Sequence, residues 1–518
     1  MYYYFTFQFS AIQKAILRHD RLWSIAGMSL MLSQLNEIKF REIVTSIDAD
    51  ALVLVAGGGK FTARFTDKDK ARELRNKVIK AVSTRLPMLE FQASDVIAGE
   101  SLKAIKTDDV SGLRPGIIHG LNEQRRCLRG YGVSFNPHLK LCHECSEYPA
   151  IYGLKIEKEK EKEKEEDKEV CSVCSDAHKA ARIDIGELKE KEDDPLTTIE
   201  RIYKLYINSY NISSIKVPLD FKDLFADYHT ERGQRMAVWM SDLNNMGDRL
   251  RGWFTNEGED EIPGIFKEIT RVNIDIVASA LVETFVPEQD NRKHLPFRLI
   301  VAGGDDLCIV MDERYILSLV LNLSCCLNEK INELDDTHPL SNKSGNRYCF
   351  GGSFVVTSIH TPFSKIHAVG EACMGKAKQE TNRKANSVNW RIMAEAQESV
   401  TESLLRFERP IFVEDFDNQK DNPIAGRLSF KAYVELSRRY SISQSHVQQI
   451  ISAMIEYKND PREVENWLIK HATNEGDREF TQILCDSCFK NATDPFDCAK
   501  LATMLELMSI NDKGRENR

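Results

Sequence analysis

Two stretches of this chain share one pattern of apolar and polar positions. In residues 297–310 an apolar run leads into Gly303-Gly304-Asp305-Asp306, and a second apolar run follows. Apolar runs of this length around two glycines predict two buried strands joined by a tight turn, a β-hairpin. The segment Val53–Phe61, with Gly57-Gly58-Gly59-Lys60 at its centre, matches Leu299–Leu307 position by position.

The surroundings of the two hairpins repeat as well. Each hairpin is followed by a helix with apolar residues at helical spacing, predicted over Asp69–Val82 and Tyr315–Asn328. Upstream, Phe9-Ser10-Ala11-Ile12 precedes a predicted helix as Met240-Ser241-Asp242-Leu243 does. Self-similarity over this distance predicts an internal repeat of domain size.

Only the second copy carries carboxylates. Its Asp242, Asp305 and Asp306 correspond to Ala11, Gly59 and Lys60 of the first copy. Taken alone, Gly-Gly-Asp-Asp is also an ordinary exposed turn, because turns favour both residue types. The acids are present or absent as a set, however, which favours a pair of related domains of which one binds metal.

The remaining pattern predicts an α+β protein. Residues Tyr2–Phe9 alternate as a strand does, and strands and amphipathic helices also alternate through both repeats. This order predicts two ferredoxin-like domains of the palm or cyclase type. Residues 428–507 are helical throughout in pattern. We expect five segments: a first palm with a degenerate site, a zinc module, a helical linker, a second palm and a helical C-terminal domain, over 1–140, 141–176, 177–230, 231–410 and 411–518.

Two Cys-x-x-Cys pairs lie between the repeats. Cys142 with Cys145 and Cys171 with Cys174 have the spacing of a tetrahedral zinc site, in which four thiolates leave no catalytic position open. The alternative is four unpaired buried cysteines. The Lys155–Glu169 run between the pairs consists mostly of lysine and glutamate, and it predicts a solvated helix or loop because it has little to bury.

Composition narrows the class of protein. The 518 residues are 42% hydrophobic and 29% charged, with a formal net charge of −9, which argues against a surface covered in positive charge but allows a local basic groove. No apolar run approaches the roughly 18–20 residues of a membrane span, and the N-terminus lacks the basic region of a signal peptide. We therefore expect no membrane partner. Thirteen cysteines, an odd number with four in a metal-type pattern, favour a reducing cytoplasm over a disulfide framework.

The acid set predicts a two-metal site. Asp242 ends a predicted strand, and Asp305 with Asp306 lies on the neighbouring hairpin, so three carboxylates can hold two divalent cations about 4 Å apart. Hard cations such as Mg²⁺ or Mn²⁺ prefer oxygen ligands, and the backbone carbonyl of Leu243 can add one. This layout suits nucleotidyl transfer to a 3′-hydroxyl with loss of pyrophosphate.

Nucleotide phosphates need donors and positive charge nearby. The backbone N–H groups of Asn244, Asn245 and Met246 lie at a predicted helix N-terminus, which favours phosphate binding. Lys376 and Lys378 can neutralise a triphosphate, although each is also consistent with an ordinary surface charge. Gly303 and Gly304, which form the turn, complete the predicted nucleotide-binding set.

With paired domains, an intervening zinc module and Gly-Gly-Asp-Asp in the second domain only, the chain resembles the large signature subunit of type III CRISPR effector complexes. The resemblance covers most of the chain. In the second palm it rests on Ser241–Gly247, Gly303–Asp306 and Ala377-Lys378, and in the first on Ile12-Gln13, Gly27-Met28-Ser29 and Gly57–Gly59.

This resemblance implies an activity and partners. The second palm would convert ATP into cyclic oligoadenylate messengers when the complex binds target RNA. Asp242 and Asp305 would be metal ligands, Asp306 would be essential to catalysis, and Asn245 and Lys378 would contact ATP. The implied partners are the other CRISPR effector subunits, with CRISPR RNA and target RNA bound through the complex.

Two features depart from the pattern of this family. Many members begin with an HD nuclease domain, whereas the first palm is expected here from residue 2 and His19-Asp20 is an isolated dipeptide. Many members also have Asp where this chain has Asn244, which removes a nearby charge without removing an expected metal ligand.

Two other functions stay open at this point. The first is a scaffold subunit that binds proteins and RNA without catalysis, against which the intact acid set argues. The second is a stand-alone nucleotide cyclase. The zinc module, the degenerate first palm and the helical C-terminal region argue against that function, because a stand-alone cyclase does not need them.

Overall fold

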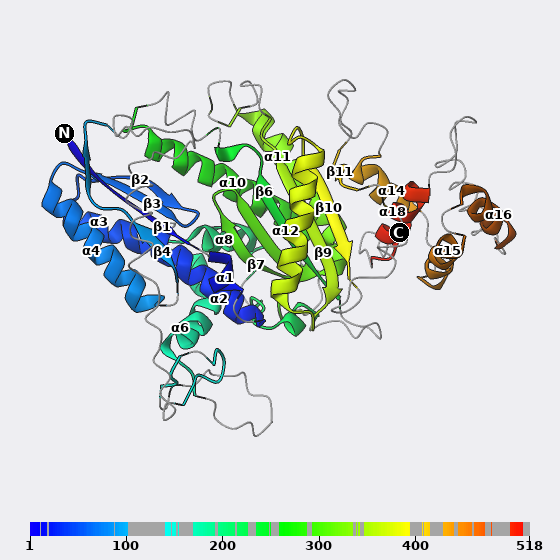
Figure 1. The fold of residues 1–518 in the computed structure, drawn as a ribbon, viewed down its shortest axis with the longest axis horizontal. Coiled ribbons are helices and arrows are strands. Elements are labelled where there is room, and N and C mark those ends of the chain that lie inside the picture. Colours follow the sequence, from blue (N-terminus) through cyan, green and yellow to red (C-terminus); the bar gives the residue numbers. More distant parts are fainter. Residues whose placement is uncertain are drawn as a thin grey trace. The chain divides into compact units, whose positions relative to one another are not determined.

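A computed structural model gives the fold of the chain (Figure 1). The structure describes most of residues 1–510. The longer stretches outside the description are 102–139, 155–168, 226–234, 250–257, 287–292, 342–346, 394–406, 415–427, 472–477, 479–497 and 511–518, and one to four residues are also omitted at several other points. The predicted Lys/Glu loop over residues 155–168 and the predicted helix after Asp242, beyond residue 250, therefore lie outside the described residues.

The chain divides into two compact units. The first comprises Met1–Asp227, Asn245–Ala278 and Pro287–Leu307, and the second comprises Tyr228–Asn244, Ser279–Val286 and Cys308–Arg518. Each unit is built from segments that are distant in the sequence.

The first unit contains a five-stranded antiparallel sheet. Strand β1 (Tyr2–Phe9) is its centre and pairs with three others, which satisfies the backbone hydrogen bonds on both of its edges. The order is β2-β3-β1-β4, and β5 also pairs with β1. The other strands are β2 (Leu52–Gly57), β3 (Lys60–Phe65), β4 (Phe91–Ala93) and β5 (Ile97–Gly99).

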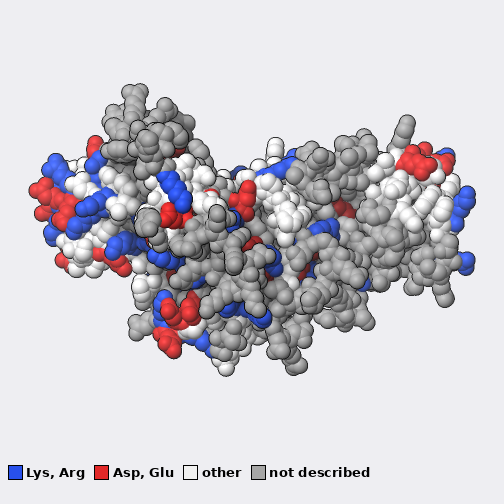
Figure 2. Space-filling model, turned by 90° about the horizontal axis from the view of Figure 1, so that it is seen from below, with Lys and Arg blue, Asp and Glu red and all other residues white. Residues whose placement is uncertain are grey.

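Helices α3 (Phe40–Ile47) and α4 (Lys68–Arg85) lie along this sheet (Figure 1). Under them, Phe7 packs against Phe40 and Phe91 with ring centroids 5.3 and 5.2 Å apart, so the core of the sheet is aromatic. Figure 2 shows both signs of charge interspersed over this part of the first unit. The described surface of α4 is therefore mixed in charge, since Lys70 pairs with Asp48 and Lys77 with Glu73.

The first unit also holds the helices that flank the cysteine pairs and strand β7 (Phe297–Gly303). Helix α2 (Leu22–Ser33) continues as a π-helix over Gln34–Lys39, an extension that the apolar pattern did not predict. The remaining helical elements of this unit are α1 (Ile12–Ile16), α6 (Ser172–Ala181), α7 (Ile185–Glu190), α8 (Thr198–Tyr210), η2 (Phe221–Phe225) and most of α10 (Ile262–Thr284).

The second sheet has six strands in the order β11-β10-β9-β6-β8-β7. It is mixed, because β9 pairs in parallel with β10 and antiparallel with β6. Strands β6 and β9 are buried along almost their whole length, and their sequences are accordingly rich in apolar and small residues. The strands in the second unit are β6 (Arg235–Leu243), β8 (Asp306–Asp312, from Cys308 on), β9 (Phe350–Ser358), β10 (Ser387–Ile392) and β11 (Ile411–Phe412).

Helix α12 (Phe363–Glu380) covers β9 and β10 in the second unit (Figure 1). Close packing is possible because Gly370 leaves room for Met240, whose Cε would lie 1.7 Å from a β-carbon at Gly370. The other helices are η3 (Glu313–Tyr315), α11 (Ile316–Glu333), α14 (Phe430–Arg439), α15 (Gln444–Glu456), α16 (Pro461–His471) and α18 (Cys498–Met508).

The mixed α+β class with a helical C-terminal segment, predicted from the sequence, is confirmed. The ferredoxin-like type of each sheet domain and the bounds of the five predicted segments stay predictions.

Candidate functional site

The two repeated turns differ in backbone conformation. Each hairpin has a two-residue loop: Gly58-Gly59 between β2 and β3, and Gly304-Asp305 between β7 and β8. Gly58 and Gly59 both have positive φ, 56° and 75°, as a type I′ turn requires. In the second loop Gly304 has φ 64° and Asp305 is not left-handed, which is the pattern of a II′ turn with glycine at its first central position. An L-residue is therefore accommodated at position 305.

The first turn is less suited to the corresponding acid. A β-carbon at Gly59 would lie 2.4 Å from Cδ1 of Ile12, and the left-handed backbone at this position disfavours any L-residue. The replacement of Asp305 by Gly59 thus has a conformational reason, in addition to the lost carboxylate. Asp305 is half-buried and Asp306 is exposed, and both belong to the first unit.

Asp242 belongs to the second unit and is held by a lysine. It lies near the end of β6, directly opposite Gly351 of β9 in the antiparallel register. Lys378 of α12 crosses over Gly351, since its Cγ would lie 2.3 Å from a β-carbon there, and its Nζ makes an ion pair with Asp242. Any side chain at Gly351 would push the lysine away, so the glycine makes this pair possible.

The other predicted site residues lie close to these elements in sequence. Asn244 follows β6 and is only 1% exposed; its N–H donates to the carbonyl of Cys349 at 2.8 Å and its Nδ2 to Cys349 Sγ at 3.3 Å. Its Oδ1 is buried with no hydrogen-bond partner among the described residues. Leu243 ends β6, and Asn245 next to it has φ 60°. Lys376 is exposed on α12.

Sequence reasoning missed a residue that contacts the acid-bearing turn. Asn273 of α10 donates from Nδ2 to the carbonyl oxygen of Gly304 at 2.8 Å. The apolar pattern around it, from Val272 to Ile276, predicts a helix but gives no signal for this contact. A long-range hydrogen bond of this kind follows from the tertiary fold alone.

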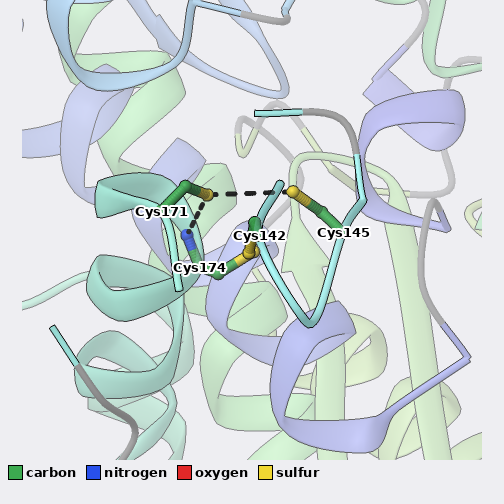
Figure 3. Close-up of side chains that lie close together, drawn as sticks. All are labelled: Cys142, Cys145, Cys171 and Cys174. Carbon is green, nitrogen blue, oxygen red and sulfur yellow. Dashed lines mark hydrogen bonds between the residues drawn. The ribbon is translucent and has the colours of Figure 1, made fainter. Parts of the chain in front are cut away.

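The four cysteines between the repeats form one cluster (Figure 3). Their sulfur atoms all lie within 4.8 Å of one another, and Cys145 Sγ is 3.8 Å from Cys171 Sγ. Tetrahedral Zn²⁺ with bonds of ~2.3 Å separates its sulfur ligands by about 3.8 Å, so the cluster matches the geometry that the ion requires. Hydrogen bonds among the four sulfurs lower the pKa of the Cys142 thiol and raise the pKa of the Cys171 and Cys174 thiols, so one thiolate is shared by the cluster when no metal is bound.

Helix α6 fixes the cysteine cluster to the first unit. Cys171 is its N-cap, and its Sγ accepts from the N–H of Cys174 at 3.4 Å. Along the helix, Gly27 of α2 approaches so closely that a β-carbon would lie 1.9 Å from the carbonyl oxygen of Ala177.

At the other end of α6, Arg298 of β7 donates to the carbonyl of Ala181 at 2.9 Å. Arg298 is 1% exposed and also donates to the carbonyl of Pro218. A cation at a helix C-terminus is favourable, although burial lowers the pKa of this guanidinium.

Comparison with solved structures identifies the fold. Csm1 in T. onnurineus matches 98% of this chain and 69% of its own with a TM-score of 0.52 at 14% sequence identity. The apo Csm1–Csm4 cassette matches with a TM-score of 0.54 at 13% identity, over 98% of this chain and 70% of that one. This chain has the fold of Csm1. Csm1 is the large subunit of type III CRISPR complexes, so the resemblance drawn from the motifs is confirmed at the level of fold.

The Csm1–Csm4 cassette in complex with pppApApA has a similar score, 0.53, with 13% identity over 98% of this chain and 69% of that one. No protein-family model and no curated protein matches the sequence, so the likeness to Csm1 rests on the fold. Among the described residues, no helix has the length and apolar character needed to cross a membrane.

Proposed function

We propose that this chain is the large subunit of a type III CRISPR effector complex and converts ATP into cyclic oligoadenylates when the complex binds target RNA. The observation that carries the proposal is the fold shared with Csm1 over 98% of the chain, in a sequence that retains the complete acid set. Csm1–Csm4 structures in complex with pppApApA, ATP and cA3 give the class of ligand.

Asp242, Asp305 and Asp306 are the proposed ligands and catalytic groups for Mg²⁺ or Mn²⁺. Carboxylates are the donors that these hard cations prefer. Asp242 supports this role, because it already attracts a cation, the Lys378 ammonium. Bound divalent cations would supply an activated 3′-hydroxyl and stabilise the leaving pyrophosphate.

The remaining site residues act on the nucleotide. Lys378 balances the charge of Asp242 in the absence of nucleotide and would turn toward a phosphate of bound ATP. We assign Asn244, Asn245, Gly303, Gly304 and Lys376 to ATP binding, and the carbonyl of Leu243 to the metal. These assignments are supported by their positions at the end of β6, in the turn and on α12.

The zinc and the partners belong to the same proposal. Cys142, Cys145, Cys171 and Cys174 would hold one structural Zn²⁺, since their sulfurs have the spacing of a closed tetrahedral site. Other effector subunits would bind this chain as Csm4 accompanies Csm1, and CRISPR RNA and target RNA would be bound through the complex.

The test is the double variant Asp305→Ala, Asp306→Ala in the assembled, target-bound complex. Loss of two metal-binding carboxylates should reduce oligoadenylate formation by at least ~100-fold. Mass spectrometry of the nucleotide products measures this reduction, and an unchanged yield of oligoadenylate would refute the proposal. Native gels would check that the variant still assembles.

A non-catalytic scaffold and a stand-alone cyclase make different predictions. A scaffold would bind no ATP in the presence of Mg²⁺ by calorimetry. A stand-alone cyclase would produce nucleotide without target RNA, and its product would be a dinucleotide or a cyclic mononucleotide. Mass spectrometry with and without target RNA separates these outcomes from ours.

A further inference from the structure

The turn that carries Asp305 and Asp306 is held from helix α10. Asn273 donates from Nδ2 to the carbonyl oxygen of Gly304 at 2.8 Å. This carbonyl belongs to the peptide that joins Gly304 to Asp305. Because a peptide unit is planar, fixing its oxygen also fixes the direction of the Asp305 N–H and the start of the Asp305 residue.

Glycine flexibility makes this hydrogen bond important. Gly304 has φ 64° and no side chain that packs against a neighbour. A β-carbon placed there would lie 3.9 Å from Cα of Gly58, so the turn lies beside the corresponding turn of the first repeat without interlocking with it. The hydrogen bond from Asn273 is the specific polar contact that favours one orientation of this peptide.

Helix α10 is in turn fastened to the first sheet. Arg64 of β3 donates to Glu259 at 3.3 Å and to Asp260 at 2.5 Å, just before the helix begins. Tyr4 of β1 donates to the same Glu259 at 2.8 Å. Burial and this hydrogen bond raise the pKa of Tyr4, which keeps the phenol protonated as the donor. The Arg64 and Glu259 side chains are only 14% and 10% exposed, so the contact is largely shielded from solvent.

We propose that Asn273 is a positioning residue for the Gly303–Asp306 turn, and that the first sheet supports it through α10. The inference rests on the proposed function, because it gives a role to the first repeat, which lacks the acids itself. The chain of contacts runs from Tyr4 and Arg64 through Glu259 to α10, and from Asn273 to Gly304. It gives Asp305 a defined orientation before any ligand binds.

The experiment compares Asn273→Leu with the wild type in the full target-bound complex. Leucine has a similar shape but cannot donate a hydrogen bond. Since a misplacement of ~1 Å costs about 100-fold, we expect kcat to fall by roughly 10- to 100-fold, with the KM for ATP changed by less than ~2-fold. Asn273→Gln keeps an amide donor and should recover part of the lost kcat.

A second readout does not depend on activity. Hydrogen–deuterium exchange in peptides covering residues 297–312 should be faster in Asn273→Leu than in the wild type. Arg271→Ala is the matched control, because Arg271 lies on the same helix and pairs with Glu268 and Asp275 at the surface. It should change neither kcat nor the exchange of the turn.

The outcomes separate the two proposals. A wild-type complex that makes no oligoadenylate contradicts the proposed function, whatever Asn273 does. An active wild type with unchanged kcat and exchange in Asn273→Leu overturns the positioning role, and so does a loss that Asn273→Gln fails to recover. If the leucine variant does not fold, Asn273→Asp takes its place, because an ionised carboxylate of the same shape cannot donate.

Discussion

Several buried charged residues of this protein have neighbours that set their protonation. Glu313 follows β8, is 8% exposed and pairs with Arg235 at 2.7 Å. Burial raises the pKa of Glu313 to about 7, and the charge of Arg235 offsets only part of this effect. Burial likewise raises the pKa of Glu506 above its usual range. A carboxyl group with a raised pKa has a definite consequence for stability.

The folded protein binds the Glu313 proton more tightly than the unfolded chain, whose pKa is 4.5. The free energy of unfolding should therefore fall as pH rises from about 4.5 to about 7, by roughly 3 kcal/mol from this group alone. Glu313→Gln should remove this contribution, since glutamine does not titrate. Urea denaturation of both proteins between pH 5 and 8 measures it.

The difference between the two stability curves isolates Glu313, because Glu506 titrates in both proteins. If the free energies of unfolding of the wild type and Glu313→Gln differ by the same amount at every pH from 5 to 8, the pKa of Glu313 is not raised in the folded protein.

At the scale of single elements, helix α6 depends on the cysteine cluster. It has only 10 residues, and Cys171 forms both its N-cap and one side of the cluster. Helices this short have little stability of their own, so packing and the cluster must hold α6 in place.

Cys171→Ser tests this dependence with the cap preserved, because serine is a good N-cap. We expect bound zinc to fall from about one per chain to near zero and the thermal unfolding temperature to drop. Atomic absorption and calorimetry measure these quantities. Cys325→Ser is the control, because Cys325 is exposed and outside the cluster; equal zinc content in both variants would rule out the site.

Individual elements could be predicted from the sequence, whereas contacts between distant residues could not. Local pattern predicted strand β1 and the hairpin turns, because alternation and glycine position are properties of neighbouring residues. It did not predict that Lys378 pairs with Asp242, since 136 residues separate them and Gly351 makes the approach possible. Arg298 did leave a signal, a charge inside an apolar run, but its partners at Ala181 and Pro218 come only from the fold.

At the scale of the whole molecule, the chain passes between its units repeatedly. Asp242 lies in one unit, and Asp305 with Asp306 lies in the other. Since the segments of the two units alternate between residues 228 and 307, no single cut gives two fragments that each contain one complete unit. Functional tests therefore need the full chain.

The C-terminal segment is joined to the second sheet by a buried charge. Glu506 of α18 accepts from Nε1 of Trp390 at 2.9 Å and from Arg409 at 2.7 Å. The Arg409 side chain is only 6% exposed, so its charge depends on Glu506. This pair lies where β10 meets a helix whose last residues, 501–508, are all buried.

Glu506→Ala should destabilise the protein by about 3–5 kcal/mol, because it removes the carboxylate that accepts from the buried Arg409 guanidinium. Chemical denaturation measures the loss, and limited proteolysis should show earlier cleavage in the C-terminal segment. Glu463→Ala, on the exposed side of α16, is the control and should change stability by less than ~0.5 kcal/mol. Similar losses of stability in Glu506→Ala and Glu463→Ala would show that the Glu506–Arg409 pair contributes little to the stability of the fold.

The conformation of the first turn also limits how this protein can change. An acid at Gly59 would have to adopt the left-handed conformation of a I′ turn, and Cδ1 of Ile12 would have to shift. A single substitution at Gly59 would therefore place the new carboxylate on a backbone that differs from that of Asp305. An engineer who wants two equivalent acid-bearing turns in one chain should transplant the whole β7–β8 hairpin, with its supporting helix, rather than exchange individual residues.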